Sequence, residues 1–149
     1  MTEVTIRKAL PGDVAAMTEL ALRSKQSNGY SDAFMEACRE ELRVTEAALS
    51  EAEYWVAVDA EICGMAALGP EGEVHAFFID PDRKRQGIGR LLWDALRLRA
   101  EALGHETLHL DADPEAVPFY EKLGFVVVGE APSGSIPGRM LPRMERDLR

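Results

Sequence analysis

The sequence predicts an α/β (α+β) fold: a single domain over residues 1–149, with a mixed, mostly antiparallel sheet flanked by helices. The chain has 149 residues, a length that can bury a sizeable core within one domain. Strand patterns joined by short turns occupy its middle, which favours antiparallel pairing. Helical patterns separate the later strands, which favours helices on both faces of the sheet. No internal repeat or low-complexity linker divides the chain.

Several segments show the alternation or the short apolar runs that are typical of strands. They are residues 4–10, 54–59, 62–69, 73–80, 107–111, 125–130 and 138–148, the last expected as an edge strand. Apolar residues at helical spacing predict helices at residues 14–26, 31–42, 45–52, 90–103 and 115–123. We expect Asp13 to cap the first helix and Ser31 to cap the second. Gly104 and Gly124 are expected to end the last two.

Composition excludes several classes of function. The formal net charge is -9 and the sequence pI is near 4.8, which argues against broad nucleic-acid binding because that needs an extended basic face. No stretch approaches the ~20 apolar residues of a membrane span, and the N-terminus lacks the pattern of a secretory signal. Cys38 and Cys63 stand in no metal or redox spacing. We therefore expect a cytoplasmic protein with reduced thiols and with no nucleic-acid or membrane partner.

A basic turn containing two glycines occupies residues 83–90, RKRQGIGR, between an expected strand and an expected helix. Helix N-termini present free N–H groups that bind anions, and Gly87 and Gly89 allow a phosphate to approach the backbone closely. The turn lacks the Lys-Ser/Thr pair of a P-loop, and Leu92 stands where a dinucleotide fingerprint has Gly or Ala. Alternatively, the glycines make only a tight turn with a solvated basic loop. The cations around the turn are Arg83, Lys84, Arg85 and Arg90.

Residues 74–96 (VHAFFIDPDRKRQGIGRLLWDAL) resemble the acetyl-coenzyme A motif of the GNAT superfamily of N-acetyltransferases. In register, Lys84 takes the first position, where Arg or Gln is usual, and Gly87 and Gly89 take the glycine positions. A second block, residues 113–125 (DPEAVPFYEKLGF), resembles the C-terminal motif of the family. Its matching positions are Ala116, Tyr120, Gly124 and Phe125, with Asp113 standing where Asn is frequent.

The resemblance covers essentially the whole chain, and residues 20–42 are similar to one uncharacterised branch of the family. It implies the GNAT acyl-CoA acyltransferase fold and an enzyme that uses acetyl-CoA as the acetyl donor, without a metal. The pyrophosphate and 3′-phosphate would lie at the basic turn, and backbone groups near Phe78 and Ile79 would hold the pantetheine arm. The implied cofactor-binding residues are Phe78, Ile79, Lys84, Arg85, Gln86, Gly87, Ile88, Gly89, Arg90, Asp113 and Phe119.

The resemblance implies direct attack of a neutral amine on the thioester, which requires a base, a donor to the carbonyl and an acid for the thiolate. Tyr120 is the candidate acid because a phenol stays protonated at neutral pH, although a core tyrosine is the alternative. His75 and Glu73 share one face of the expected strand and are the candidate bases, since imidazole exchanges protons near neutral pH. Asp111 is a third option, and a water chain could replace all three.

The acceptor side carries fewer signals. By resemblance, the first two helices and their junction form one wall of the acceptor pocket. Asn28 and Tyr30 are the substrate-binding candidates, and Arg23 or Lys25 could meet a carboxylate. An exposed basic turn at a helix end explains the same residues equally well. We expect a small-molecule amine or an amino-acid-like acceptor; the alternatives are a non-catalytic acyl-CoA-binding module and a protein or peptide N-acetyltransferase.

Other polar and sulfur-containing residues are expected to have structural roles. His109 and Asp111 share one face of a strand, but His105 lies in the turn before it, so a metal site is disfavoured. Cys63 stands within an apolar strand and is expected to lie in the core. A homodimer through the last strands is a hypothesis that rests on the resemblance alone.

Overall fold

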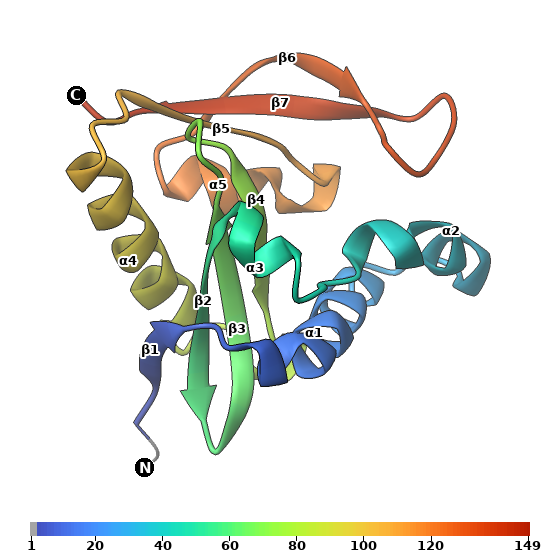
Figure 1. Cartoon of the computed structure of the whole chain (residues 1–149). Coiled ribbons are helices and arrows are strands. Elements are labelled where there is room, and N and C mark those ends of the chain that lie inside the picture. The colour runs from blue at the N-terminus through green and yellow to red at the C-terminus, as the bar shows by residue number, and fades with distance from the viewer. Residues whose placement is uncertain (1–2) are drawn as a thin grey trace.

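The structure is a computed structural model that describes residues 3–149. It confirms the α/β expectation, with two antiparallel sheets and helices packed against them (Figure 1). The first sheet has the strand order β1-β2-β3-β4, and the second has the order β5-β7-β6. The strands are β1 (Thr5–Lys8), β2 (Glu53–Asp59), β3 (Glu61–Leu68), β4 (Val74–Ile79), β5 (Thr107–Asp111), β6 (Val126–Pro132) and β7 (Met140–Asp147).

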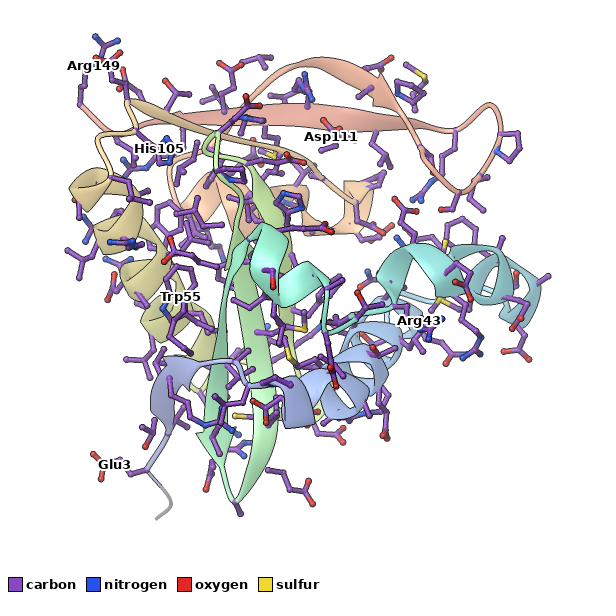
Figure 2. The ribbon with its side chains drawn as sticks, in the orientation of Figure 1. Glu3, Arg43, Trp55, His105, Asp111 and Arg149 are labelled. Carbon is purple, nitrogen blue, oxygen red and sulfur yellow. The ribbon has the colours of Figure 1, made fainter. Side chains whose placement is uncertain are left out.

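Helices α1 and α4 pack on opposite faces of the first sheet (Figure 1). Trp55 and Val56 are neighbours in β2 and enter these two cores separately, as the alternation of a strand requires. Trp55 lies toward α4 (Figure 2). The helices are α1 (Val14–Gln26), α2 (Asp32–Leu42), α3 (Ala48–Glu51), α4 (Ile88–Ala102) and α5 (Val117–Lys122).

The expected helix ends are correct with one exception. Ser31 Oγ accepts a hydrogen bond from the Phe34 N–H and caps α2, and Gly104, with φ +84°, follows the end of α4. Asp13, expected to cap α1, makes no cap hydrogen bond to that helix. Its carboxylate instead accepts from the Leu10 N–H at 2.8 Å and binds the guanidinium of Arg7 at 2.7 Å. Arg7 of β1 therefore binds the Asp13 carboxylate, which the sequence pattern predicted as the cap of α1.

The last strand was expected at an edge, and this expectation is wrong. β7 lies between β5 and β6 and pairs antiparallel with both. Met144 of β7 is fully buried, whereas Val126, Val127 and Val128 of β6 are exposed. The β6–β7 hairpin returns the chain between β5 and β6, so that β6 lies at the edge of this sheet.

Strands β4 and β5 run side by side in parallel but diverge after one contact. The isolated bridge Glu73–His109 and the hydrogen bond from the His109 N–H to the Gly72 carbonyl, 3.0 Å, join them at one end. Beyond that point, within residues 3–149, β4 pairs only with β3. The β4 backbone from Ala76 to Ile79 therefore presents an unpaired edge to the opening. Among the described residues no helix is long and apolar enough to cross a membrane.

Candidate active site

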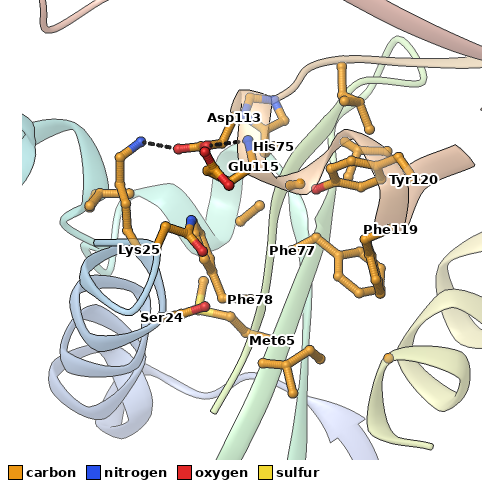
Figure 3. A pocket seen from close by; sticks show the side chains of 18 of the residues that line it. Ser24, Lys25, Met65, His75, Phe77, Phe78, Asp113, Glu115, Phe119 and Tyr120 are labelled. Carbon is orange, nitrogen blue, oxygen red and sulfur yellow. Dashed lines mark hydrogen bonds and ion pairs between the residues drawn. The ribbon is translucent and has the colours of Figure 1, made fainter. Parts of the chain in front are cut away.

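A cavity of about 650 Å³ occupies the space where β4 and β5 diverge. Small-molecule sites commonly enclose about 300–1,000 Å³. Its walls come from the end of α1, the end of α2, β4, the N-terminus of α4 and α5. Figure 3 shows Lys25, Phe78 and Phe119 among the side chains that surround it. Residues that are distant in the sequence thus share one site.

Backbone N–H groups of α4 open into this cavity. Gly87 is the N-cap residue, with φ +81°, and a side chain at this position would meet no atom within 4 Å. No side-chain oxygen caps this helix within residues 3–149. Because the N–H groups of a first helical turn have no intrahelical partner, those of Ile88, Gly89 and Arg90 are available to an anion.

Lys84 and Arg85 add positive charge next to these N–H groups. Both line the cavity, and within residues 3–149 neither is part of an ion pair. Arg85 has φ +65°, a left-handed conformation that is uncommon outside glycine and that costs backbone strain. Arg90 also lines the cavity, 3.6 Å from Asp94. An anion-binding site with open space, free N–H groups and unpaired cations fits a diphosphate.

Arg83 has a different role from the other cations of the turn. Its guanidinium donates to Asp59 Oδ2 at 2.7 Å and to Gln86 Oε1 at 2.7 Å. Asp59 lies at the β2–β3 turn, and its side chain is only 5% exposed. Arg83 also lines the cavity, but its guanidinium binds the turn to the sheet, so Lys84, Arg85 and Arg90 are the cations of the turn that have no bond to the sheet within residues 3–149. Gln86, a predicted cofactor-binding residue, does not line the cavity.

Gly89 is required by packing as well as by ligand access. A Cβ atom at this position would lie 3.2 Å from the ring of Phe119. That ring comes from α5 and tilts against Phe77 of β4, with 5.2 Å between the centroids. The sequence motif predicted both Gly89 and Phe119 as cofactor-binding residues, but it gave no sign that they contact each other. Helix α4 therefore approaches α5 closely at Gly89.

Tyr120, the candidate acid, lies in α5 among aromatic rings. It is 9% exposed and makes edge contacts with Phe77, Phe119 and Phe125. Burial, with a smaller contribution from the negative charge of Asp113, raises the pKa of Tyr120 above its ordinary value. Within residues 3–149 its hydroxyl forms no hydrogen bond, yet the residue lines the cavity. The phenol thus remains a neutral proton donor at neutral pH.

The candidate bases lie in different settings. β4 has a bulge at His75, since Ala67 pairs with Ala76 and Leu68 pairs with Val74. His75 lines the cavity and its Nε2 atom lies 3.5 Å from Glu73 Oε2. Glu73 itself does not line the cavity.

The two side chains lie next to each other, as the prediction of a shared face requires, but the bulge interrupts the strand pairing at His75 and only His75 lines the cavity. Asp111 lines the cavity at the end of β5, but its carboxylate accepts from Arg143 at 2.9 Å. Of the three named candidates, His75 is thus the cavity-lining group without a strong protein partner.

The acceptor candidates are divided as well. Asn28 lines the cavity, whereas Tyr30 does not. The Tyr30 hydroxyl donates to Asp113 Oδ1 at 2.7 Å, and burial together with this carboxylate raises the pKa of Tyr30 to about 12. Asp113, predicted to bind the cofactor, also accepts from the Glu115 N–H at 2.9 Å.

The cations expected to meet a substrate carboxylate already have partners. Arg23 lies 3.3 Å from Asp80, and Lys25 lies 3.3 Å from Asp113. Each of these two cations is therefore already paired with a carboxylate of this chain. Sequence reasoning also missed some cavity-lining residues, because no motif connects their segments: Glu41, Arg43 and Leu141.

The remaining polar candidates lie apart. Figure 2 shows His105 and Asp111 well separated along the second sheet. No group of three or more His, Cys, Asp or Glu that could hold a metal occurs within residues 3–149. Cys63 is buried, as expected, and burial raises the pKa of its thiol. A buried thiol with a raised pKa is a poor nucleophile.

Comparisons with known proteins agree with this architecture. The family model "Acetyltransferase (GNAT) domain" matches residues 18–135. The chain is 43% identical over 86 residues to the peptidyl-lysine N-acetyltransferase YjaB of Salmonella typhimurium, covering 56% of this chain and 57% of the relative. The chain thus spans little more than half the length of that curated relative.

Solved structures match over nearly the whole chain. The GCN5-related N-acetyltransferase (aminotransferase, class II) from Rhodopseudomonas palustris superposes with a TM-score of 0.85 at 25% identity, covering 99% of this chain and 98% of that one. The PaiA N-acetyltransferase from Thermoplasma acidophilum, solved in complex with coenzyme A, has a TM-score of 0.80 at 21% identity, with 97% and 99% covered. The motifs, the fold and the family match agree, and the chain belongs to the GNAT acetyltransferase family.

Proposed function

We propose that this chain is an acetyl-CoA-dependent N-acetyltransferase that acetylates a primary amine of a small or amino-acid-like molecule. The observation that carries the proposal is the single cavity that joins the free N-terminus of α4, the unpaired edge of β4 and the Tyr120 hydroxyl. These three features are suited, in order, to a diphosphate, an extended amide-containing arm and a departing thiolate. Family membership supports the same activity.

Two parts of the chain would bind the cosubstrate. The N–H groups of Ile88, Gly89 and Arg90, with Lys84 and Arg85, would hold the diphosphate of the cosubstrate. Backbone groups of β4 near Phe78 and Ile79 would bind the amides of the arm. When bound, acetyl-CoA supplies a thioester carbonyl that a neutral amine can attack.

Two side chains would then move protons. His75 would take a proton from the amine, directly or through water, because it lines the cavity next to β4. As the C–S bond breaks, Tyr120 would donate its phenolic proton to the thiolate. Burial keeps the phenol protonated at neutral pH, so its proton is present when the thiolate forms.

The walls of the acceptor end support a small acceptor. Side chains from three separate segments meet beside the cavity: Tyr30 follows α1, Asp113 follows β5 and Arg139 precedes β7. Their contacts join the α1–α2 junction to the β6–β7 loop, which leaves less room for an extended peptide. Acetylation of a peptidyl lysine is the second candidate, favoured by the relative YjaB, whose name states that activity.

The test is release of free thiol from acetyl-CoA in the presence of a panel of amines. The panel contains lysine methyl ester, phenylethylamine, 1,5-diaminopentane and a lysine-containing peptide, with Tyr120→Phe assayed in parallel. We expect turnover with at least one small amine and loss of most of it in the variant. Turnover with the peptide alone would select the second candidate. Binding of acetyl-CoA without turnover on any amine would contradict the enzymatic proposal.

A further inference from the structure

Asp113 occupies an unusual position at the edge of the cavity. Its carboxylate lies between two cations, 3.3 Å from Lys25 Nζ and 3.8 Å from a guanidinium nitrogen of Arg139. All three side chains are mostly buried, with 16%, 15% and 18% exposed for Lys25, Asp113 and Arg139. Ion pairs in such settings are less screened by solvent than surface pairs.

The Tyr30 hydroxyl completes this cluster. It donates to Asp113 Oδ1 at 2.7 Å and accepts from Arg139 at 2.8 Å. Its ring stacks on Phe34 at 4.1 Å between centroids, and Lys25 and Arg139 both lie over this pair of rings. The cluster therefore combines a charge-assisted hydrogen bond with cation–π contacts.

The two oxygens of Asp113 have different partners. Oδ1 accepts from the Glu115 N–H at 2.9 Å and thereby caps the short turn that leads into α5, the helix of Tyr120. Oδ2 is buried and accepts no hydrogen bond within residues 3–149. Oδ2 is consequently stabilised by the charge of Lys25, which Figure 3 shows directed toward it.

We propose that Asp113 is a positioning residue that locks the acceptor wall, formed by the α1–α2 junction and the β6–β7 loop, against the turn that carries α5. This inference rests on the proposed acetyltransferase function for its consequence, which is correct placement of the amine. Lys25 and Asp113 line the cavity, so the lock is part of the wall. Without the carboxylate, Lys25 and Arg139 would face each other as uncompensated charges, and the two segments would separate.

The variant Asp113→Asn removes the negative charge of the side chain while keeping its shape. Asparagine caps a turn about as well as aspartate and still accepts from Tyr30, so the fold around α5 is kept. We expect the acceptor KM for lysine methyl ester, or for a faster amine of the panel, to rise by about tenfold, a factor that corresponds to about 1.4 kcal/mol. The dissociation constant of acetyl-CoA, measured by calorimetry, should change by less than the acceptor KM, because the diphosphate site at the N-terminus of α4 is untouched.

A readout that needs no turnover separates this inference from the proposed function. Amide hydrogen exchange at residues 27–31 and 133–139 should become about tenfold faster in Asp113→Asn, because both segments lose their common anchor. Glu36→Gln is the control: it also removes one carboxylate, from an exposed ion pair with Arg39 on α2. Its exchange and kinetics should match the wild type.

Two further variants test the same inference, and Tyr30→Phe does so even if Asp113→Asn does not fold. Tyr30→Phe removes only the hydroxyl and should accelerate exchange in the same two segments. Lys25→Met combined with Asp113→Asn should raise KM less than the two single changes together, because both partners of one pair are then absent. Unchanged exchange in Asp113→Asn or Tyr30→Phe would overturn the lock, whether or not turnover is found. A fall in kcat with an unchanged acceptor KM would also overturn it, since it would assign Asp113 to the chemistry.

Discussion

The two ends of the cavity are constructed in different ways. The cofactor end consists mainly of backbone: the first turn of α4, the left-handed Gly87 that precedes it and the unpaired edge of β4. The acceptor end consists of side chains from distant segments, exemplified by Tyr30, Asp113 and Arg139. A backbone site can serve one constant ligand with few sequence requirements, whereas a side-chain network can be altered to suit another acceptor.

The comparison predicts its largest effect at Gly89. Gly89→Glu should weaken acetyl-CoA binding by about 100-fold or more, because it places a carboxylate among N–H groups that bind phosphate. It also puts a Cβ atom 3.2 Å from the Phe119 ring. Calorimetry measures the affinity.

Gly89→Ala is the matched control for that crowding alone. It should weaken binding far less, since the ring has to move by only a few tenths of an ångström. Equal losses in the two variants would show that packing rather than charge is responsible. An undiminished acetyl-CoA affinity in Gly89→Glu would show that the cofactor does not bind at the N-terminus of α4.

Tyr120→Phe should produce the next largest effect, on turnover alone. We expect kcat to fall by about 100-fold, within the range for loss of a general acid, while the acetyl-CoA dissociation constant changes by less than about twofold. Stability should hold, because the lost hydroxyl has no protein hydrogen-bond partner within residues 3–149. A collapse of cofactor affinity would instead make Tyr120 a packing residue.

The pH dependence of kcat tests the same residue. The pKa of Tyr120 is raised in the folded protein, so the protonated acid persists to higher pH than a free phenol, whose value is about 10. We expect Tyr120 to contribute no loss of kcat between pH 7 and about pH 9. A decline of the wild-type kcat between pH 7 and about pH 9 that is absent from Tyr120→Phe would contradict a raised pKa of Tyr120.

His75→Gln should have an intermediate effect, about tenfold on kcat/KM at neutral pH, because water can replace a base in part. Glu73→Gln is the control, since Glu73 does not line the cavity. The difference in kcat/KM between His75→Gln and the wild type should become smaller from pH 6 to about pH 9, because the free amine becomes more abundant. Equal effects of the two changes would indicate that the pair, rather than His75, acts as the base.

The smallest effects distinguish two kinds of cation in the basic turn. Lys84→Met should weaken acetyl-CoA binding by a few-fold and reduce its dependence on salt, because an exposed, unpaired charge is lost. Arg83→Met should leave the salt dependence nearly unchanged but lower the thermal midpoint, since Asp59, 5% exposed, loses its partner. Identical salt dependence in the two variants would contradict the separate roles.

The features that the sequence predicted are those made by contiguous residues, and the features that it did not predict depend on contacts between distant segments. Gly87, Gly89 and Tyr120 stand in contiguous motifs, so the helix that follows Gly87 and the place of Tyr120 on a short helix were both predictable. The bulge at His75, the insertion of β7 between β5 and β6 and the pairing of Arg83 with Asp59 were not, because they depend on register and on partners far along the chain. Lys25 and Arg23 looked available to a substrate because their carboxylate partners lie more than fifty residues away in the sequence.

A crystal structure of this protein with coenzyme A tests the central claim most directly, namely that the opening between β4 and β5 is the cosubstrate site. We expect the diphosphate at the N–H groups of Ile88, Gly89 and Arg90, the pantetheine arm along the free edge of β4 and the thiol near the Tyr120 hydroxyl. Coenzyme A bound elsewhere, or bound here with its thiol directed away from Tyr120, would contradict it.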